Sequence, residues 1–493
     1  MKINYIHLII MTILVALTAC DEDFESINVN PNNPENVSPD LLMVTAIRGT
    51  VNDIVIDGFN VGNIVAQYAT EIREPNVDRY IWLGSFGTWN DGYNNLRNVV
   101  NLQKIAEDRG HENYQGIALV LKSILFQRIT DAYGMLPYEE ALQGKTEGIY
   151  FPDYDSQEEV YQGIIADLEQ ANQLLSSNGG NIDKDILYNG DHMKWRKLAN
   201  SLKMRVLVRQ SNQVDPSARL REMVNNPQQY PIFESNADQA TLDYIESPNY
   251  YPLANYRSGH FLDRRLSKRL ADQLNSTGDP RIKVFARPTQ ESQEAFQAGN
   301  GELQWAGVLN GETDDNLGSN IDDKVSAFGE IYYVDQQEQA DAEGIIMTYS
   351  ELQFILAEAA ARGWINGDAE SYYLEGIEAS IAYYSGVSGR NLEPEAGFYQ
   401  QEGIAFEEEN ALVLIGTQKW ISLFSTGLQG WFEWRRTGFP NLQPALVNNN
   451  DDQIPVRFRY PTDQQVTNED NYQEAISTQG ADNINTLVWW DKQ

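Results

Sequence analysis

Apolar residues recur at helical spacing in the first half of the chain. Residues 115–133 carry them three or four positions apart, at Ile117, Val120, Leu121, Ile124 and Leu125. Ser156 and Glu159 form a capping-box pair, which is typical of a helix N-terminus, and the apolar face that follows consists of Tyr161, Ile164, Ile165, Leu168 and Leu175. Residues 193–211 predict another helix, which is basic on one side. Because the spacing matches the 3.6-residue period, we interpret these segments as helices that bury one face.

The same period returns near residue 350. Ser350 and Gln353 are interpreted as a second capping box, and the apolar face after it consists of Leu352, Ile355, Leu356 and Ala359. Gly367 and Asp368 interrupt the pattern, and the next helical face consists of Tyr373, Ile377, Ile381 and Tyr384. Residues 350–386 therefore predict a helix–turn–helix that is loosely tetratricopeptide-like, although no strict 34-residue period is present.

Helical periodicity fades between these two regions, where Gly, Asn, Asp and Gln become more frequent. Long ordered loops in compact proteins often carry function. We therefore expect a mostly α fold with tetratricopeptide-like helical pairs, in one domain over residues 41–493. Its helical framework is expected at about 41–230 and 346–440, and its loop-rich region at about 231–345.

The N-terminus has the layout of an export signal. Lys2 gives a positive start, and the apolar core from about residue 8 to residue 17 is too short to cross a hydrocarbon layer about 30 Å thick. Leu17-Thr18-Ala19-Cys20 matches the bacterial lipobox, in which cleavage leaves the cysteine as the first mature residue, carrying lipid. We therefore expect a lipoprotein signal peptide at residues 1–19 and a lipidated tether at residues 20–40.

Cys20 is the only cysteine in the chain, so it has no partner for an intramolecular disulfide. The alternative is an ordinary secretory signal with an accidental cysteine. The acidic run at residues 21–23 resembles the export signal that sends lipoproteins of Bacteroidetes-type bacteria to the outer leaflet of the outer membrane. Lipid on Cys20 would anchor the protein, because each buried CH₂ contributes about 0.8 kcal/mol.

The net charge of −35 argues against binding to nucleic acid, which depends on Lys and Arg side chains neutralising phosphates. It also argues against a basic membrane-binding face. The chain has 10 Trp, 26 Tyr and 17 Phe. Most of them are expected in the core, but their number leaves room for an aromatic binding platform.

Catalytic and metal motifs are scarce. The four histidines include no metal-spaced pair, and the sequence has no Gly-x-Ser-x-Gly elbow or phosphate-binding glycine loop. The 71 acidic residues leave open a carboxylate pair for glycoside hydrolysis. Residues 313–323 could hold a structural calcium ion, but their register departs from an EF-hand loop, and a solvated acidic loop is the favoured interpretation. We expect no cofactor.

Seven stretches, in order along most of the chain, resemble the SusD/RagB family of surface glycan- and nutrient-binding lipoproteins, particularly its SusD-like subgroup. They are the lipobox with NVNPNNPENVSPDLL (28–42), RITDAYGMLPYEEALQG (128–144), YDSQEEVYQGIIADLEQANQLL (154–175), HMKWRKLANSLKMRVLVR (192–209), GDPRI (278–282), TYSELQFILAEAAARGW (348–364) and TQKWISLFSTGLQGWFEWRRTGFP (417–440). The resemblance implies four tetratricopeptide-like helical pairs supporting an irregular ligand-binding half. It also implies a partner, a SusC-like TonB-dependent outer-membrane transporter, over which the protein acts as a lid.

Candidate binding residues come from the loops. Trp82 lies in a turn-rich stretch without helical period, so its ring is a candidate platform for a sugar. Further ligand-binding candidates are Tyr80, Arg73, Asn76, Asp78, Tyr251, Tyr256 and Trp305. Trp89 is expected in the core, because it shares helical spacing with Tyr93. Glu433, beside Arg435 and Arg436, is interpreted as part of a structural ion pair closing a helix end, rather than as a clamp for an acidic ligand.

These expectations combine into one functional hypothesis. The chain is expected to be a non-enzymatic lipoprotein, anchored in the outer membrane and facing the cell exterior, that captures an oligosaccharide and delivers it to the transporter. The alternatives are a peptide-binding member of the same family, a surface glycosidase, and a helical-repeat scaffold that binds only protein.

Overall fold

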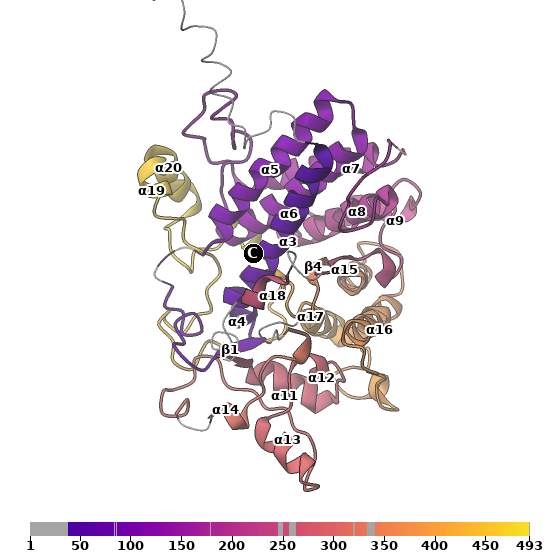
Figure 1. The fold of residues 1–493 in the computed structure, drawn as a ribbon, viewed down its shortest axis with the longest axis vertical. Coiled ribbons are helices and arrows are strands. Elements are labelled where there is room, and N and C mark those ends of the chain that lie inside the picture. Colours follow the sequence, from indigo (N-terminus) through magenta and orange to yellow (C-terminus); the bar gives the residue numbers. More distant parts are fainter. Residues whose placement is uncertain are drawn as a thin grey trace, which may run out of the picture.

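A computed structural model describes residues 38–82, 84, 86–177, 179–244, 250–255, 263–318, 321–332 and 341–492. The predicted lipidation site, Cys20, and the ligand-binding candidate Tyr256 lie outside these residues. Within them, helices dominate (Figure 1), which confirms the mostly α fold. Every described helix is too short or too polar to span a membrane.

The first helical group packs in the order of the sequence (Figure 1). It consists of α3 (Pro39–Asp57), α5 (Thr88–Asp108), α6 (Glu112–Tyr133), α7 (Gln157–Leu174), α8 (His192–Arg209) and α9 (Ser217–Asn225). Helix α6 contacts α3, α5, α7 and α8, and it is therefore buried on all sides from Gly116 to Tyr133, apart from a partly exposed Lys122. The capping box of Ser156 and Glu159 at the start of α7 is present as predicted.

The second helical group contacts the first through α15, which packs against α8. It consists of α15 (Tyr349–Ala361), α16 (Ala369–Ser388), α17 (Ala411–Ser422) and α18 (Gln429–Thr437). Asp368, where the helical pattern is interrupted, caps α16, and the predicted face of α16 is buried. The capping box predicted at Ser350 is wrong. Thr348 caps α15 by accepting from the Glu351 N–H at 3.1 Å, and Ser350, already inside the helix, donates to the Gly376 carbonyl at 2.6 Å.

The region expected to be loop-rich contains more regular structure than its composition indicated. Its helices are α11 (Lys268–Thr277), α12 (Ile282–Phe285), α13 (Gln290–Gln297) and α14 (Ile321–Lys324). Two small antiparallel sheets join this region to the framework: β1 (Ala69–Glu71) pairs with β3 (Arg264–Leu266), and β2 (Ala240–Leu242) pairs with β4 (Gly344–Met347). These short elements have too few turns to show a clear period in the sequence.

Short elements complete the chain. They are the π-helical turn η1 (Gly58–Gly62), α4 (Asn63–Val65), α19 (Gln464–Thr467), α20 (Glu469–Gln479) and the 3₁₀ turns η2 (Asn236–Asp238), η3 (Pro252–Asn255), η4 (Glu330–Tyr332), η5 (Phe398–Gln400), η6 (Glu408–Asn410) and η7 (Trp489–Asp491).

A buried ion network joins three helices of the second group, α15, α17 and α18. Arg436 of α18 pairs with both Glu433 and Glu358, and Lys419 of α17 lies 2.9 Å from Glu433. Helix α18 then ends at Gly438, whose φ of +75° favours glycine. The structural role predicted for Glu433 and Arg436 is therefore confirmed.

Candidate functional site

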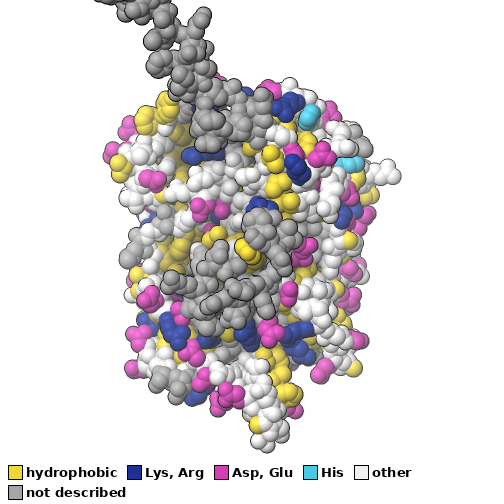
Figure 2. All heavy atoms as spheres, viewed as in Figure 1, with side chains coloured by type: hydrophobic (Ala, Val, Ile, Leu, Met, Phe, Trp, Pro, Cys, Tyr) yellow, Lys and Arg dark blue, Asp and Glu magenta, His cyan; other side chains and the backbone are white. Residues whose placement is uncertain are grey.

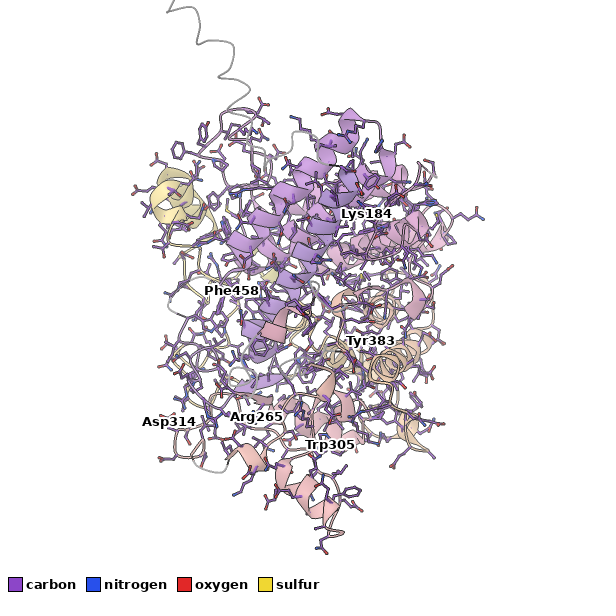
Figure 3. The ribbon with its side chains drawn as sticks, viewed as in Figure 1. Lys184, Arg265, Trp305, Asp314, Tyr383 and Phe458 are labelled. Atoms are coloured by element: carbon purple, nitrogen blue, oxygen red, sulfur yellow. The ribbon has the colours of Figure 1, made fainter. Side chains whose placement is uncertain are left out.

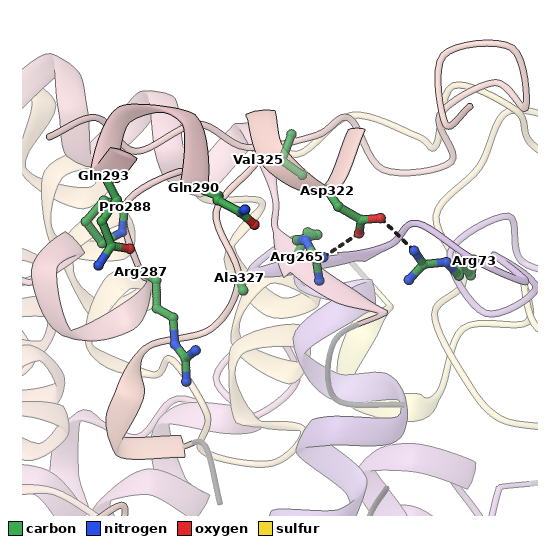
Figure 4. A pocket seen from close by; sticks show the side chains of 9 residues that line it. All are labelled: Arg73, Arg265, Arg287, Pro288, Gln290, Gln293, Asp322, Val325 and Ala327. Carbon is green, nitrogen blue, oxygen red and sulfur yellow. Dashed lines mark hydrogen bonds and ion pairs between the residues drawn. The ribbon is translucent and has the colours of Figure 1, made fainter. Parts of the chain in front are cut away.

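A cavity of about 440 Å³ lies between β3, α13 and α14 (Figure 4). Figure 1 places α13 and α14 in the lower part of the molecule, below the helical framework. Three guanidinium groups and two carboxamides supply most of the polar surface of the cavity. We call it the arginine cavity, and its lining consists of Arg73, Arg265, Arg287, Pro288, Gln290, Gln293, Asp322, Val325 and Ala327.

The β1–β3 pair builds one side of the arginine cavity. Glu71, the last residue of β1, lies opposite Arg264, and its carboxylate accepts from the Arg264 guanidinium at 2.6 Å and from the N–H of Val77 at 2.9 Å. These bonds fix the turn that follows β1 and carries Arg73. Arg265, the next residue on β3, forms a bridge with Ala327, so the segment after α14 runs beside β3.

Asp322 of α14 joins the two arginines of this side. Its carboxylate lies 2.6 Å from the Arg265 guanidinium and 2.6 Å from that of Arg73 (Figure 4). Arg73 also pairs with Asp263 at 2.8 Å, yet its side chain stays 52% exposed. Arg265 is only 6% exposed. The Arg73 guanidinium is therefore held in place while it remains open to solvent.

Helix α13 builds the opposite side. Its N-cap is Thr289, whose hydroxyl accepts from the Ser292 N–H at 3.2 Å. Gln290 and Gln293 are three positions apart, so they lie on the same face of the helix, and both line the cavity. Their exposed carboxamides can each donate and accept hydrogen bonds.

The cavity is electropositive although the chain is strongly acidic. Its lining carries three arginines and one carboxylate, whereas the whole chain has a net charge of −35. Burial lowers the pKa of Arg265, while the hydrogen bond to Asp263 raises the pKa of Arg73. On the face shown in Figure 2, Lys and Arg side chains gather across the lower part of the molecule. Such a surface suits a ligand rich in hydroxyl or carboxylate oxygens.

The predicted platform at Trp82 is contradicted by its burial. The Trp82 side chain is 4% exposed, and its indole N–H donates to the Val77 carbonyl at 3.0 Å. Its ring is enclosed by those of Tyr80, Phe86, Trp431 and Phe458, at centroid distances of 6.4, 5.1, 6.2 and 5.5 Å. Figure 3 places Phe458 well above Arg265, so this aromatic cluster and the arginine cavity are separate.

Three further candidates are also held inside the protein. Tyr80 is 3% exposed and Asp78 is 1% exposed. Asp78 accepts from the Asn310 side chain at 2.6 Å and from the Gly311 N–H at 2.8 Å, and its burial raises its pKa to about 6. Tyr251 is 3% exposed and packs its edge against another tyrosine. None of the three can contact a ligand in this conformation.

The remaining candidates have different positions. Arg73 lines the cavity, and Asn76 is exposed in the turn that follows it. Trp305 is half-buried, with its indole N–H donating to the Ala286 carbonyl at 3.0 Å, and it does not line the cavity. Trp89 is buried, as predicted.

Of the nine lining residues, the sequence predicted only Arg73 as a ligand-binding residue. The polar lining residues that it missed include Arg265, Arg287, Gln290 and Gln293. The paired glutamines after Pro288-Thr289 had a readable signal, because a cap residue followed by polar residues three apart predicts one polar helix face. The lining arginines had no such signal in the sequence.

The acidic segment 313–323 forms ion pairs with arginines: Asp314 pairs with Arg79, and Asp322 pairs with Arg73 and Arg265. The described residues contain no cluster of three or more His, Cys, Asp or Glu placed to hold a metal ion.

Comparisons with known proteins agree with this architecture. The SusD-like family model, described as starch-binding and associating with the outer membrane, matches residues 31–461. A solved SusD homologue from Bacteroides fragilis is 27% identical, with a TM-score of 0.80 over 92% of this chain and 100% of its own. A chitin-binding protein is 28% identical, with a TM-score of 0.78 over 92% and 100%. A chitin-binding SusD homologue from Flavobacterium johnsoniae is 24% identical, with a TM-score of 0.74 over 92% and 99%, and shows the fold alone. No curated protein matches.

Proposed function

Since this chain belongs to the SusD-like family of outer-membrane-associated, starch-binding proteins, we propose that it is a non-enzymatic surface lipoprotein that captures an oligosaccharide in the arginine cavity. The family match over most of the chain carries this proposal. The chitin-binding relative at 28% identity supports a saccharide ligand.

The chemistry of the cavity supports the same ligand class. A saccharide offers many hydroxyl groups that both donate and accept hydrogen bonds. Arg73 would donate to their oxygens, while Gln290 and Gln293 would pair with hydroxyls in either direction. The cavity volume of about 440 Å³ falls within the range of roughly 300–1,000 Å³ that is typical of small-ligand sites.

The anchor and the transporter complete the proposal. Lipid on Cys20 would hold the protein at the outer membrane, facing the cell exterior, and residues 20–40 would tether it beside a SusC-like TonB-dependent transporter. As a lid over that transporter, the protein would bury well over about 1,000 Å² of total surface against it. Gentle detergent extraction should then copurify a β-barrel protein of transporter size. A protein that always runs alone, even after cross-linking in cells, would refute the lid.

The ligand class is tested by calorimetric titration of the mature protein with maltohexaose, chitohexaose, xylohexaose and mannohexaose, beside a mixture of random hexapeptides. We expect saturable binding of at least one hexasaccharide, and no new reducing ends of the saccharide in the calorimeter cell after the titration. Binding of peptides alone would identify a peptide-binding family member instead. Release of reducing ends would reveal a glycosidase.

A further inference from the structure

We propose that the protein has a second saccharide-binding site, in a cleft far from the arginine cavity. This inference rests on the proposed function, because it takes the ligand to be a glycan. The cleft encloses about 500 Å³ between α5, the segment at residues 137–152 and the α19–α20 turn, which lie together in the upper part of Figure 1, whereas α13 lies at the bottom. We call it the tyrosine cleft, after Tyr150.

One exposed aromatic side chain, that of Tyr150, marks the cleft. Tyr150, which lines it, is 73% exposed, and its neighbour Phe151 is 67% exposed. Two adjacent aromatic rings in water are costly, since each leaves much apolar surface unburied. Neither ring has a structural role in the core that would account for the cost, so the exposed Tyr150 points to a ligand that covers it.

The Tyr150 ring is oriented although it is exposed. A Cβ atom built on Gly144 would lie 3.3 Å from the Tyr150 ring, so the ring packs against the bare backbone there. The segment that carries it is tied to α20, because Asn468 donates to the Pro152 carbonyl at 2.8 Å and Asn471 donates to the Phe151 carbonyl at 3.0 Å. Holding the ring in place in advance reduces the entropy lost on binding.

Helix α5 supplies a polar wall and an aromatic floor. Asn90, Asn94 and Arg97 are spaced by four and three positions, so their exposed side chains share one face of the helix. Trp89 and Tyr93 lie beneath them, with ring centroids 5.1 Å apart. The Tyr93 hydroxyl donates to the Pro137 carbonyl at 2.6 Å, which ties this floor to the segment that leads to Tyr150.

The α19–α20 turn supplies the other wall. Asp463 caps α19, and the Gln464 side-chain carbonyl accepts from the Tyr154 hydroxyl at 3.0 Å, which leaves its NH₂ group free to donate. The Thr467 hydroxyl donates to the Asp463 carbonyl at 2.7 Å and can still accept a hydrogen bond from a ligand. Both walls therefore offer donors and acceptors to a ligand lying across Tyr150.

This combination fits a neutral saccharide. The C–H face of a sugar ring stacks on an aromatic ring, while its hydroxyls need partners that both donate and accept, as amides do. The charges of Arg97 and Asp463 balance within the lining, so the cleft does not favour an anion. Two sites on one protein would raise its avidity for a long polysaccharide without strengthening either contact.

The test counts bound ligands. Native mass spectrometry of the mature protein with maltohexaose, chitohexaose, xylohexaose and mannohexaose should show up to two copies of the recognised hexasaccharide on the wild type. We expect one copy on Tyr150→Ala, one on Arg73→Ala and none on the double variant. Tyr150→Trp should restore the second copy. Phe151→Ala is the matched control, because Phe151 is equally exposed but does not line the cleft, and it should still bind two.

The outcomes separate this inference from the proposed function. A single copy on the wild type that Tyr150→Ala leaves in place would overturn the second site and leave the proposed function standing. No hexasaccharide on the wild type, with hexapeptides bound instead, would overturn both. If Tyr150→Ala keeps both copies but abolishes copurification of the transporter barrel, the cleft is a protein contact and the inference is wrong.

Discussion

Replacing Trp82 by alanine should destabilise the fold and leave glycan affinity unchanged. The substitution removes a side chain that is 4% exposed and packs against four aromatic rings. Emptying such a site lowers the free energy of unfolding by about 3–5 kcal/mol. The substitution also removes the indole N–H that donates to the Val77 carbonyl. Unfolding entropy is about 2.1 cal/mol/K per residue, so a folded body of this size gains about 1 kcal/mol/K. The thermal midpoint should therefore fall by about 3–5 °C, provided that the body unfolds as one unit.

The assay is a thermal melt monitored by calorimetry. A titration with the recognised hexasaccharide is carried out beside it, at a temperature well below the thermal midpoint. Ile81→Ala is the control, because its side chain is adjacent and 36% exposed; it should shift the midpoint by less than about 1 °C, since surface substitutions usually change stability by about 0.5 kcal/mol or less. A Trp82→Ala variant that melts with the wild type and loses binding would refute the burial argument.

Three further predictions follow from buried charge, from pH and from the anchor. Arg436→Met should destabilise the protein by about 3–5 kcal/mol in a denaturant melt, because it removes the buried guanidinium shared by Glu358 and Glu433 and leaves Glu358 paired with Arg362 and Glu433 with Lys419; a loss below about 1 kcal/mol would contradict this. Burial and the neighbouring Asp243 raise the pKa of Glu343 to about 7. Its protonated form is therefore favoured by folding, and the stability it contributes is full below about pH 4.5 and is lost as the pH rises through 7. Glu343→Gln should flatten the stability profile across this range, and an unchanged profile would count against the shift. Cys20→Ser should release the protein from the membrane or block its maturation, and mass spectrometry of the wild type should find lipid on residue 20; an unmodified Cys20 would refute the anchor.

Helices could be predicted from the sequence because their evidence is local. The faces of α7 and α16 each repeat over several turns, and the pattern indicates which side is buried; the repeat in α6 identifies the helix, although that helix is buried on all sides. The cap of α15 was misplaced by two residues because Thr348 and Ser350 both fit a capping pattern, and only the backbone conformation distinguishes them.

Trp82 shows why the site could not be predicted in the same way. Whether an aromatic ring in a turn faces water depends on its tertiary partners, and two of these, Trp431 and Phe458, are hundreds of positions away in the sequence. The arginine cavity has the same origin, since the pairing of β1 with β3 brings Arg73 beside Arg265. The sequence predicts Arg73 as a hydrogen-bonding neighbour of a platform at Trp82; that ring is buried, and Arg73 instead lines a cavity away from it.

The central claim is that Arg73 and its neighbours hold an oligosaccharide, and calorimetric titration of Arg73→Ala with the recognised hexasaccharide tests it most directly. Arg219→Ala is the control, because Arg219 also forms surface ion pairs but lies on α9, in the first helical group and outside the cavity lining. Both variants should melt close to the wild type, since exposed ion pairs contribute about 0–1 kcal/mol. Arg73→Ala should weaken binding at the arginine cavity at least about tenfold, the equivalent of 1.4 kcal/mol, while Arg219→Ala binds normally. Equal affinity of both variants and the wild type would contradict the account.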